Sequence, residues 1–127
     1  MKYKFAFICH PLKNDSEKSF GENIEEVKNI CRDIYEKHKG TIPIAPHLYF
    51  PQFMDDNNKK ERADGLEFDY ALIKSLKCDI WVYGHKISEN MLKEIKLGVE
   101  LSLPIECKEK SLERILEKVL SEFSKER

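Results

Sequence analysis

The strongest constraint on the fold is the order in which two kinds of apolar pattern follow one another along the chain. Four short apolar runs are typical of strands, and they lie at residues 3–9, 41–45, 78–84 and 103–107. Each run is followed by a longer stretch in which apolar residues recur every three or four positions, the spacing of one buried helix face. Such alternation predicts a parallel sheet with helices on both faces. We therefore expect an α/β fold with four or five parallel strands in the order 2-1-3-4(-5).

The predicted helices have recognisable ends. The first is expected at about residues 22–38, with Gly40 at its C-terminal end, and the second at about residues 60–76. Ser88 and Ser111 are suitable N-caps for the third and fourth helices, because a serine hydroxyl accepts a hydrogen bond from a backbone N–H group of the first turn. Helices of these lengths are sufficient to connect neighbouring parallel strands.

Length and charge limit the classes of protein to consider. The chain has 127 residues, which is enough for one domain, and we expect that domain to span residues 1–127. Its formal net charge is -1, whereas proteins that bind the phosphates of polymeric nucleic acid are usually basic. No apolar stretch is long enough to span a bilayer, and the N-terminal segment is typical of a strand rather than of a signal peptide. We therefore expect a cytoplasmic protein with no membrane and no polymeric nucleic acid as partner.

The sequence gives no indication of a metal or a cofactor. Its four cysteines have no CxxC spacing, and its histidines have no spacing typical of metal ligands. The dinucleotide-binding motif GxGxxG and the phosphate-binding motif GxxxxGK[ST] are both absent. The expectation is free thiols, no metal site and no cofactor.

Candidate binding residues cluster after the predicted strands. In parallel sheets, ligands bind beyond the carboxyl ends of the strands, so the loops after the first three strands should meet at one site. The polar, aromatic and turn residues of these loops are His10, Pro11, Asn14, His47, Tyr49, Phe50, Gly84, His85 and Ser88. Residues 46–58 form a long aromatic stretch without regular pattern, which is typical of a binding loop or of an interface with a partner.

Glu94 is the carboxylate of most interest. It lies in the helix that follows Ser88, and Met91 and Ile95 beside it suggest that it borders the buried side. A carboxylate in that position can attack an anomeric carbon and form a glycosyl ester. The alternative is a solvated glutamate paired with Lys93 or Lys96, which is the commoner situation on a helix.

Several short motifs, taken in order, resemble a known family. The matching segments are residues 46–50, 53–56, 61–62, 65–66, 78–84, 87–88, 91, 94–95 and 103–105. Together they resemble the nucleoside 2-deoxyribosyltransferase-like proteins, in particular a small branch common in phages and bacteria, and the resemblance covers residues 3 to about 107. It implies a flavodoxin-like three-layer α/β sandwich, a homodimer or larger homo-oligomer, and no cofactor.

The resemblance also implies a reaction. Members of this family, together with the related nucleotide N-glycosidases, cleave the bond between a base and a ribose or deoxyribose through a glutamate nucleophile, and Glu94 matches that glutamate. Six residues earlier, the transferases have an aspartate that contacts the sugar, whereas the 5′-monophosphate hydrolases have a serine that contacts phosphate. Ser88 stands at this position, at a helix N-terminus, where backbone N–H groups favour an anion. The implied substrate is a nucleoside monophosphate, and transfer and hydrolysis both remain open.

Three positions depart from the family pattern. The aspartate that holds or protonates the base is replaced by Ala71, and Asp69 lies about 200° away around the helix, so we expect that it does not substitute. Asn90 and Leu92 stand where the characterised enzymes have small residues, and larger side chains there narrow the sugar site. These departures favour an alternative function, a protein that binds a nucleotide or a nucleotide-derived signal without cleaving it.

The remaining candidates each have a functional and a structural interpretation. His47 can protonate the leaving base or contact phosphate with a pKa near neutrality, or its imidazole can cap a backbone carbonyl. Tyr49 and Phe50 can stack on a base or pack at a subunit interface. Arg62 can bind phosphate, but a salt bridge to a neighbouring carboxylate such as Asp64 is the favoured interpretation.

Overall fold

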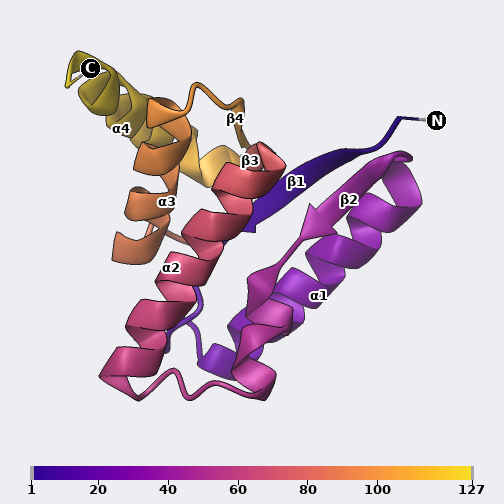
Figure 1. The fold of residues 1–127 in the computed structure, drawn as a ribbon, viewed down its shortest axis with the longest axis vertical. Helices are drawn as coiled ribbons and strands as arrows, with labels where there is room; N and C mark the ends of the chain where they lie inside the picture. Colours follow the sequence, from indigo (N-terminus) through magenta and orange to yellow (C-terminus); the bar gives the residue numbers. More distant parts are fainter. Residues whose placement is uncertain (1, 127) are drawn as a thin grey trace.

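The computed structural model describes residues 2–126, and within them strands and helices alternate as the sequence predicts (Figure 1). The strands are β1 (Lys4–Cys9), β2 (Thr41–Ile44), β3 (Asp79–Val82) and β4 (Ile105–Cys107). The α-helices are α1 (Phe20–Lys37), α2 (Lys59–Leu76), α3 (Glu89–Glu100) and α4 (Glu113–Lys125). All strand pairs are parallel and the sheet order is β2-β1-β3-β4. The predicted flavodoxin-like α/β fold is confirmed, with four strands in the described residues.

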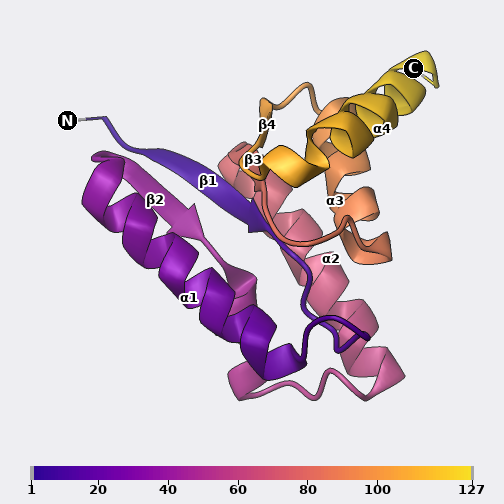
Figure 2. The ribbon, with the colours of Figure 1, turned by 180° about the vertical axis from the view of Figure 1, so that it is seen from behind.

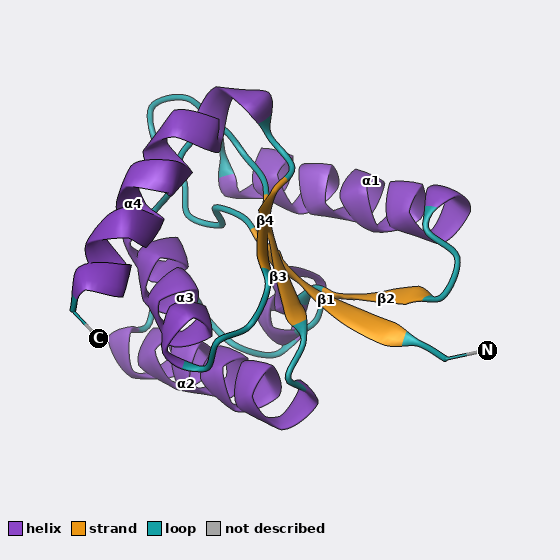
Figure 3. Cartoon of the chain, turned by 90° about the horizontal axis from the view of Figure 1, so that it is seen from above, coloured by secondary structure: helices purple, strands orange, loops and turns teal. Residues whose placement is uncertain are grey.

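The helices form a layer on each face of the sheet. Successive side chains of a strand point to opposite faces, so Ala6 and Ile8 of β1 pack with Val27 and Ile34 of α1, together with Trp81 of β3. The intervening residues of the same strands face α2, α3 and α4. Figures 2 and 3 show α1 on its own side of the sheet, away from α2 and α3. This arrangement leaves the carboxyl ends of β1 and β3 open between α2, α3 and the loop before α1.

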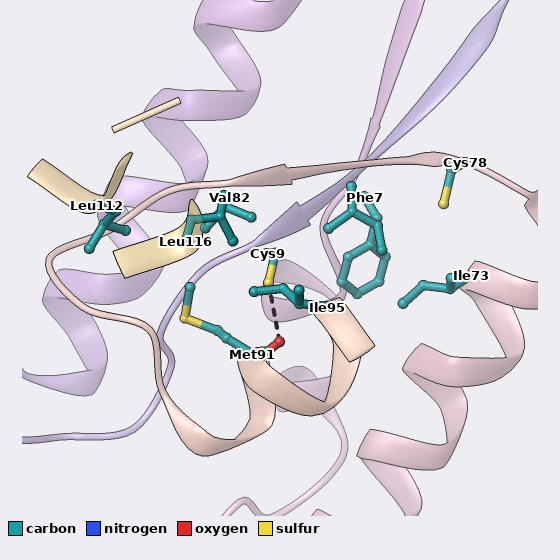
Figure 4. Packing of buried hydrophobic residues seen from close by; sticks show 10 residues of the cluster. Phe7, Cys9, Ile73, Cys78, Val82, Met91, Ile95, Leu112 and Leu116 are labelled. Carbon is teal, nitrogen blue, oxygen red and sulfur yellow. Dashed lines mark hydrogen bonds between the residues drawn. The ribbon is translucent and has the colours of Figure 1, made fainter. Parts of the chain in front are cut away.

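The larger apolar cluster holds α3 close to the sheet (Figure 4). Its fully buried members include Phe7, Ile80 and Ile95. At Gly98 of α3, an added Cβ would lie 2.5 Å from Ile80 Cδ1, so this helix packs closer than a larger residue allows. The close packing fixes the height of α3 above the sheet, and with it the position of every residue on the inner face of that helix.

The helix ends differ in part from those predicted. The helix α1 begins at Phe20, earlier than expected, because Ser19 accepts a hydrogen bond from the Glu22 N–H and the Glu22 side chain accepts one from the Ser19 N–H. Ser88 is confirmed as the N-cap of α3. Ser111 is not a cap: it lies inside a short 3₁₀ turn, Lys110–Leu112, and α4 begins after that turn without a side-chain cap.

Residues 46–58 contain two short 3₁₀ turns, Pro46–Leu48 and Phe50–Gln52. The sequence did not predict these turns, because it has no regular apolar pattern in this segment. Asn58 then caps α2 by accepting hydrogen bonds from the backbone N–H groups of Lys60 and Glu61. The segment is therefore ordered by local turns and a cap. Within residues 2–126, no helix combines the length and the apolar character needed to cross a membrane.

Candidate functional site

A cleft of about 340 Å³ lies at the carboxyl ends of β1 and β3, where the sequence predicts a binding site. Four segments form its walls: the loop after β1, the 3₁₀ turns after β2, the first half of α2 and the start of α3. The lining residues are His10, Pro11, Leu12, Lys13, Asn14, Pro46, His47, Phe50, Pro51, Met54, Asp55, Asp56, Glu61, Arg62, Gly65, Leu66, Asp69, Lys86, Ser88, Glu89, Asn90, Met91 and Glu94. The volume is at the lower end of the range for small-molecule sites.

Glu94 projects from α3 into this cleft and is only 3% exposed. The Cys9 thiol, at the end of β1, donates a hydrogen bond to its Oε1 over 3.5 Å. The two lysines that could have neutralised Glu94 on the surface are engaged elsewhere, Lys93 with Glu89 and Lys96 with Glu126. The interpretation of Glu94 as a solvated surface glutamate is therefore wrong.

Asp69 of α2 lines the same cleft and forms a carboxyl pair with Glu94. Burial raises the pKa of Asp69 to about 6, and its interaction with Glu94 opposes that rise. Burial also raises the pKa of Glu94 well above its usual range, and the negative charge of Asp69 raises it further. Two carboxyl groups so close cannot both ionise readily, so the pair retains one shared proton near neutral pH.

The position of Asp69 corrects the sequence analysis, which treated Ala71 as the position that mattered. Ala71 is exposed on the outer side of α2 and does not line the cleft. The cleft is lined by Glu61, Gly65 and Asp69, which are four residues apart and so share one helix face. That spacing was visible in the sequence, but the comparison with the family pattern considered Asp69 only as a substitute at the position of Ala71.

His47 holds the loop after β1 in place. Its Nε2–H donates a hydrogen bond to the carbonyl oxygen of His10 over 2.7 Å, and burial lowers the pKa of the imidazole to about 4. His47 is therefore neutral at physiological pH, and its buried Nδ1 has no partner within residues 2–126. The interpretation as a cap of a backbone carbonyl is confirmed, whereas the expected pKa near neutrality is wrong.

The other residues predicted from the loop after β1 also line the cleft. His10 is buried, and its Nδ1–H donates to the carbonyl oxygen of Pro11 over 2.6 Å. The Asn14 side-chain oxygen accepts a hydrogen bond from the Phe20 N–H at the start of α1. His10 and Asn14 therefore shape the loop through backbone contacts, and Pro11 contributes apolar surface to the wall.

A cluster of ion pairs lies at the rim of the cleft, before the start of α3. Asp15 Oδ2 accepts hydrogen bonds from Lys86 Nζ over 2.8 Å and from His85 Nε2 over 2.7 Å. The contact with Lys86, then those with the Lys18 N–H and His85, hold the pKa of Asp15 well below its usual range. His85 does not line the cleft, but the cluster ties the loop after β1 to the loop after β3.

Besides His85, two of the predicted binding residues lie outside the cleft lining, Tyr49 and Gly84. Tyr49 is 63% exposed and packs at the surface with Phe50 and Phe53, at ring-centroid distances of 5.5 and 5.1 Å, because the 3₁₀ turns direct only Phe50 inward. Gly84 has a φ of 109°, and an added Cβ would lie 2.5 Å from Pro11 Cδ. Gly84 thus allows the loops after β1 and β3 to meet, and its role is structural.

Arg62 lines the cleft without an ion pair to any described residue. Asp64 pairs instead with Lys60 over 2.9 Å, and Glu61 accepts a hydrogen bond from the Asp55 N–H. The salt bridge to a neighbouring carboxylate, Glu61, Asp64 or Asp55, that the sequence favoured for Arg62 is therefore not formed. Within residues 2–126, no group of three or more His, Cys, Asp or Glu side chains is arranged to hold a metal ion.

Fold and site together define a small α/β protein of flavodoxin-like topology with a buried carboxyl pair at the carboxyl edge of its sheet. A protein family described as a domain of unknown function, DUF7768, matches residues 4–108, and the chain belongs to this family. The matched region contains every strand and the whole cleft, and it ends before α4. No curated protein and no solved structure matches the chain.

Proposed function

We propose that this protein cleaves the N-glycosidic bond of a nucleoside monophosphate, with Glu94 as nucleophile. The observation that carries the proposal is the buried pair of Glu94 and Asp69 in a cleft of about 340 Å³. Two carboxyl groups with raised pKa values, one charged and one protonated, are what a reaction with a nucleophile and an acid requires. The resemblance to the deoxyribosyltransferase-like proteins supports the same chemistry.

In the proposed reaction the carboxylate of Glu94 attacks C1′ of the sugar. The bond between C1′ and the base nitrogen breaks, its electron pair goes to the base, and the base takes the proton of Asp69. A glycosyl ester of Glu94 results. Water then attacks C1′, gives a proton back to Asp69 and releases the free sugar phosphate with Glu94 ionised again. If a second base attacks in place of water, the same ester gives deoxyribosyl transfer.

The start of α3 is the proposed site of the 5′-phosphate. Ser88, Glu89 and Asn90 at this helix start line the cleft, which Lys13 and Lys86 also line, and Lys86 is paired with Asp15. Backbone N–H groups at the first turn of a helix of 12 residues, together with two lysines, favour an anionic group. Asn90 is part of the cleft lining, whereas Leu92 is not.

The other predicted residues take supporting roles in this proposal. Phe50 offers an aromatic face to the base, and Met91 lies beside Glu94 where the sugar would bind. His10, Pro11 and Asn14 form the wall after β1. His47, which the sequence analysis assigned to catalysis, instead holds that wall in position, since a neutral imidazole whose N–H is bound to a carbonyl cannot protonate the base.

The proposal includes a homodimer. Tyr49, Phe53 and Phe68 are large apolar residues with 63%, 60% and 44% of their surfaces exposed, and Phe50 links them into one aromatic patch beside the cleft. A patch of this kind favours contact with a second protein surface. A second copy bound there would lie next to the opening of the cleft.

A second candidate function is binding without cleavage. The observation that favours it is the strong upward shift of the Glu94 pKa, because a protonated glutamate is not a nucleophile. In this alternative the pair of Glu94 and Asp69 donates and accepts hydrogen bonds to a nucleotide that leaves the site unchanged.

One experiment separates the two functions. The purified protein is incubated with the ribo- and deoxyribonucleoside 5′-monophosphates, and free base is measured by chromatography beside a thermal-shift assay with the same compounds. We expect release of base from at least one compound by the wild type and none by Glu94→Ala. A nucleotide that raises Tm but remains intact supports binding alone, and base release by Glu94→Ala at the wild-type rate rejects Glu94 as nucleophile.

A further inference from the structure

Arg62 is a cation of the cleft that no neighbouring side chain neutralises. Its guanidinium has five N–H donors and no acceptor, and within residues 2–126 it has neither an ion-pair partner nor a hydrogen-bond partner. An arginine on a helix normally pairs with a carboxylate three or four positions away, but none of those positions around Arg62 holds a carboxylate. Arg62 therefore lines the cleft with its donors unused.

Arg62 lies on the same face of α2 as Asp69, nearer to the start of the helix. The two residues are about two turns apart, which is a distance of ~10 Å along the helix axis. Leu66 lies between them, and all three residues line the cleft. Long side chains on a helix point back towards its N-terminus, so the guanidinium extends away from the carboxyl pair. Arg62 can therefore contact the far end of a ligand whose sugar lies at that pair.

This end of the cleft is also where the base is proposed to bind. The loop after β2 packs here against α2: an added Cβ on Gly65 would lie 3.9 Å from Met54 Cε, and the rings of Phe50 and Phe68 are 5.4 Å apart. In Figures 1 and 2 the first turns of α2 extend beyond the start of α3, towards this loop. Arg62 is thus beside the aromatic face offered to the base, whereas the proposed phosphate site belongs to the start of α3.

The charges around Arg62 favour a neutral base over a phosphate at this end. Asp55, Asp56 and Glu61 also line the cleft, and the Asp55 N–H donates to Glu61 Oε1 over 3.0 Å, which holds these carboxylates at the start of α2. A phosphate bound to Arg62 would be repelled by them. A heterocyclic base carries no charge, and it offers acceptors to the guanidinium and N–H donors to the carboxylates.

The shape of a guanidinium selects among the bases by their acceptors. Two parallel N–H groups match two neighbouring acceptors, and O6 and N7 of guanine and hypoxanthine form such a pair. Adenine carries a donor amino group beside N7, so it cannot accept both hydrogen bonds. Cytosine has neighbouring acceptors at O2 and N3, but O2 adjoins the glycosidic bond, and its distant edge carries an amino group.

We propose that Arg62 is the residue that determines base specificity, and that the substrates are 6-oxopurine nucleoside monophosphates whose O6 and N7 accept two hydrogen bonds from its guanidinium. The inference rests on the proposed function for the position of the sugar at the carboxyl pair, and it goes further by naming the base.

The test compares four nucleotides with the wild type, Arg62→Gln and Arg62→Lys. GMP and IMP have both acceptors, AMP has a donor beside N7, and the 7-deaza analogue of GMP keeps O6 but lacks N7. Arg32→Gln is the matched control, because Arg32 of α1 is exposed, pairs with Glu36 and does not line the cleft.

Two quantities are measured for each nucleotide. The first is kcat/KM for release of the base. The second is the Kd by calorimetry in a Glu94→Gln background, where the proposed nucleophile is absent and the nucleotide remains intact. If the wild type cleaves none of the four, the Kd is measured with the wild-type background instead.

We expect GMP and IMP to be preferred over AMP and the 7-deaza analogue by about 10-fold or more in both quantities. Arg62→Gln should weaken GMP and IMP by about 10- to 100-fold and change AMP little, so the preference is lost. Arg62→Lys should also lose most of it, because an ammonium is a point charge without the planar pair of donors. Arg32→Gln should keep the wild-type preference.

Two results would overturn the proposal. One is an equal loss for all four nucleotides in Arg62→Gln that Arg62→Lys restores, since Arg62 would then bind the phosphate. The other is a base preference, or its absence, that is the same in the wild type and in Arg62→Gln.

The two quantities also separate failure of this inference from failure of the proposed function. If no base is released but the Kd values depend on Arg62 as expected, cleavage fails and the inference stands. If base is released and the preference does not depend on Arg62, the function stands and the inference fails. If none of the four nucleotides binds, both fail.

Discussion

Glu94 and Asp15 are carboxylates at the same edge of the sheet, yet their surroundings shift their pKa values in opposite directions. Glu94 is buried with another carboxyl group and one thiol donor, and its pKa rises. Asp15 accepts hydrogen bonds from Lys86, His85 and two backbone N–H groups, and its pKa falls. Burial without donors favours the neutral acid, whereas several donors favour the carboxylate even where burial slightly opposes it.

The difference separates two tasks within one site. The Asp15 cluster ties two loops together, and because the pKa of Asp15 is lowered, this carboxyl group stays charged over the physiological pH range. The Glu94 pair retains a proton because both pKa values are raised, and its ionisation lowers the stability of the folded protein as pH rises. Proteins commonly tolerate destabilising groups at a functional site and compensate for them with stabilising interactions elsewhere.

The largest expected effect comes from Glu94→Gln, which tests the buried side of the comparison. Base release should fall at least about 1000-fold, because the proposed nucleophile is lost. The same variant should have a higher Tm than wild type at pH 8, because the buried charge is removed, and the two Tm values should converge towards pH 4. Chromatography and thermal unfolding measure the two outcomes; a lower Tm at pH 8 would contradict the assigned pKa shift.

Asp69→Asn should have the next largest effect. Removal of the proposed proton donor should lower base release by about 100- to 10,000-fold, with a smaller loss for substrates whose base leaves more readily. Asp69→Asn also removes the ionisable neighbour that raises the Glu94 pKa, so the acidic limb of any remaining activity should move to lower pH.

Ala71→Asn provides the matched control on the outer side of α2. It should leave both the rate and the pH profile as in the wild type, since Ala71 is exposed and outside the cleft. An effect of Ala71→Asn as large as that of Asp69→Asn would mean that the helix face has been assigned wrongly.

Asp15→Asn tests the other side of the comparison. Because folding lowers the Asp15 pKa, its stabilising contribution is complete above about pH 4 and is lost as pH falls below that value. The variant should therefore unfold at a lower temperature than wild type at pH 7, with the difference shrinking as pH approaches 2. The difference in Tm from wild type at neutral pH therefore has the opposite sign to that of Glu94→Gln. Differences of the same sign for the two variants would contradict the contrast between Asp15 and Glu94.

The smallest expected effect concerns His47. It is the absence of a titration in the wild-type protein, so no variant is needed. With the imidazole pKa at about 4, His47 should not titrate between pH 5.5 and 8, and its proton should reside on Nε2. Nitrogen-15 correlation spectra of the histidine side chains measure both properties. A His47 resonance that titrates near pH 6.5 would restore the acid role that the sequence analysis assigned to it.

Most of the fold could be predicted from the sequence, because it depends on local patterns. Apolar runs placed the four strands, helical periodicity placed the helices, and their alternation predicted a parallel sheet with helices on both faces. The first residue of α4 was less predictable. Ser111 has the chemistry of a cap, but the chain forms a 3₁₀ turn there and begins the helix at Glu113.

The candidate site could be predicted only in part. Because strand ends meet at one edge of a parallel sheet, most of the predicted residues, including His10, His47 and Ser88, do line one cleft. Tyr49 does not: it lies between the two 3₁₀ turns with its side chain exposed, and the sequence does not show which aromatic residue of this segment faces inward.

The sequence by itself determined the order of elements, the edge of the sheet where a ligand can bind, and the presence of a carboxylate on the helix after β3. Tertiary structure decided what that carboxylate can do. The rotation of α2 directs Asp69 rather than Ala71 towards Glu94, and the packing of α3 on the sheet brings the Cys9 thiol to 3.5 Å from it. The physical reason is that a pKa depends on water exclusion and on groups distant in sequence, which no local pattern records.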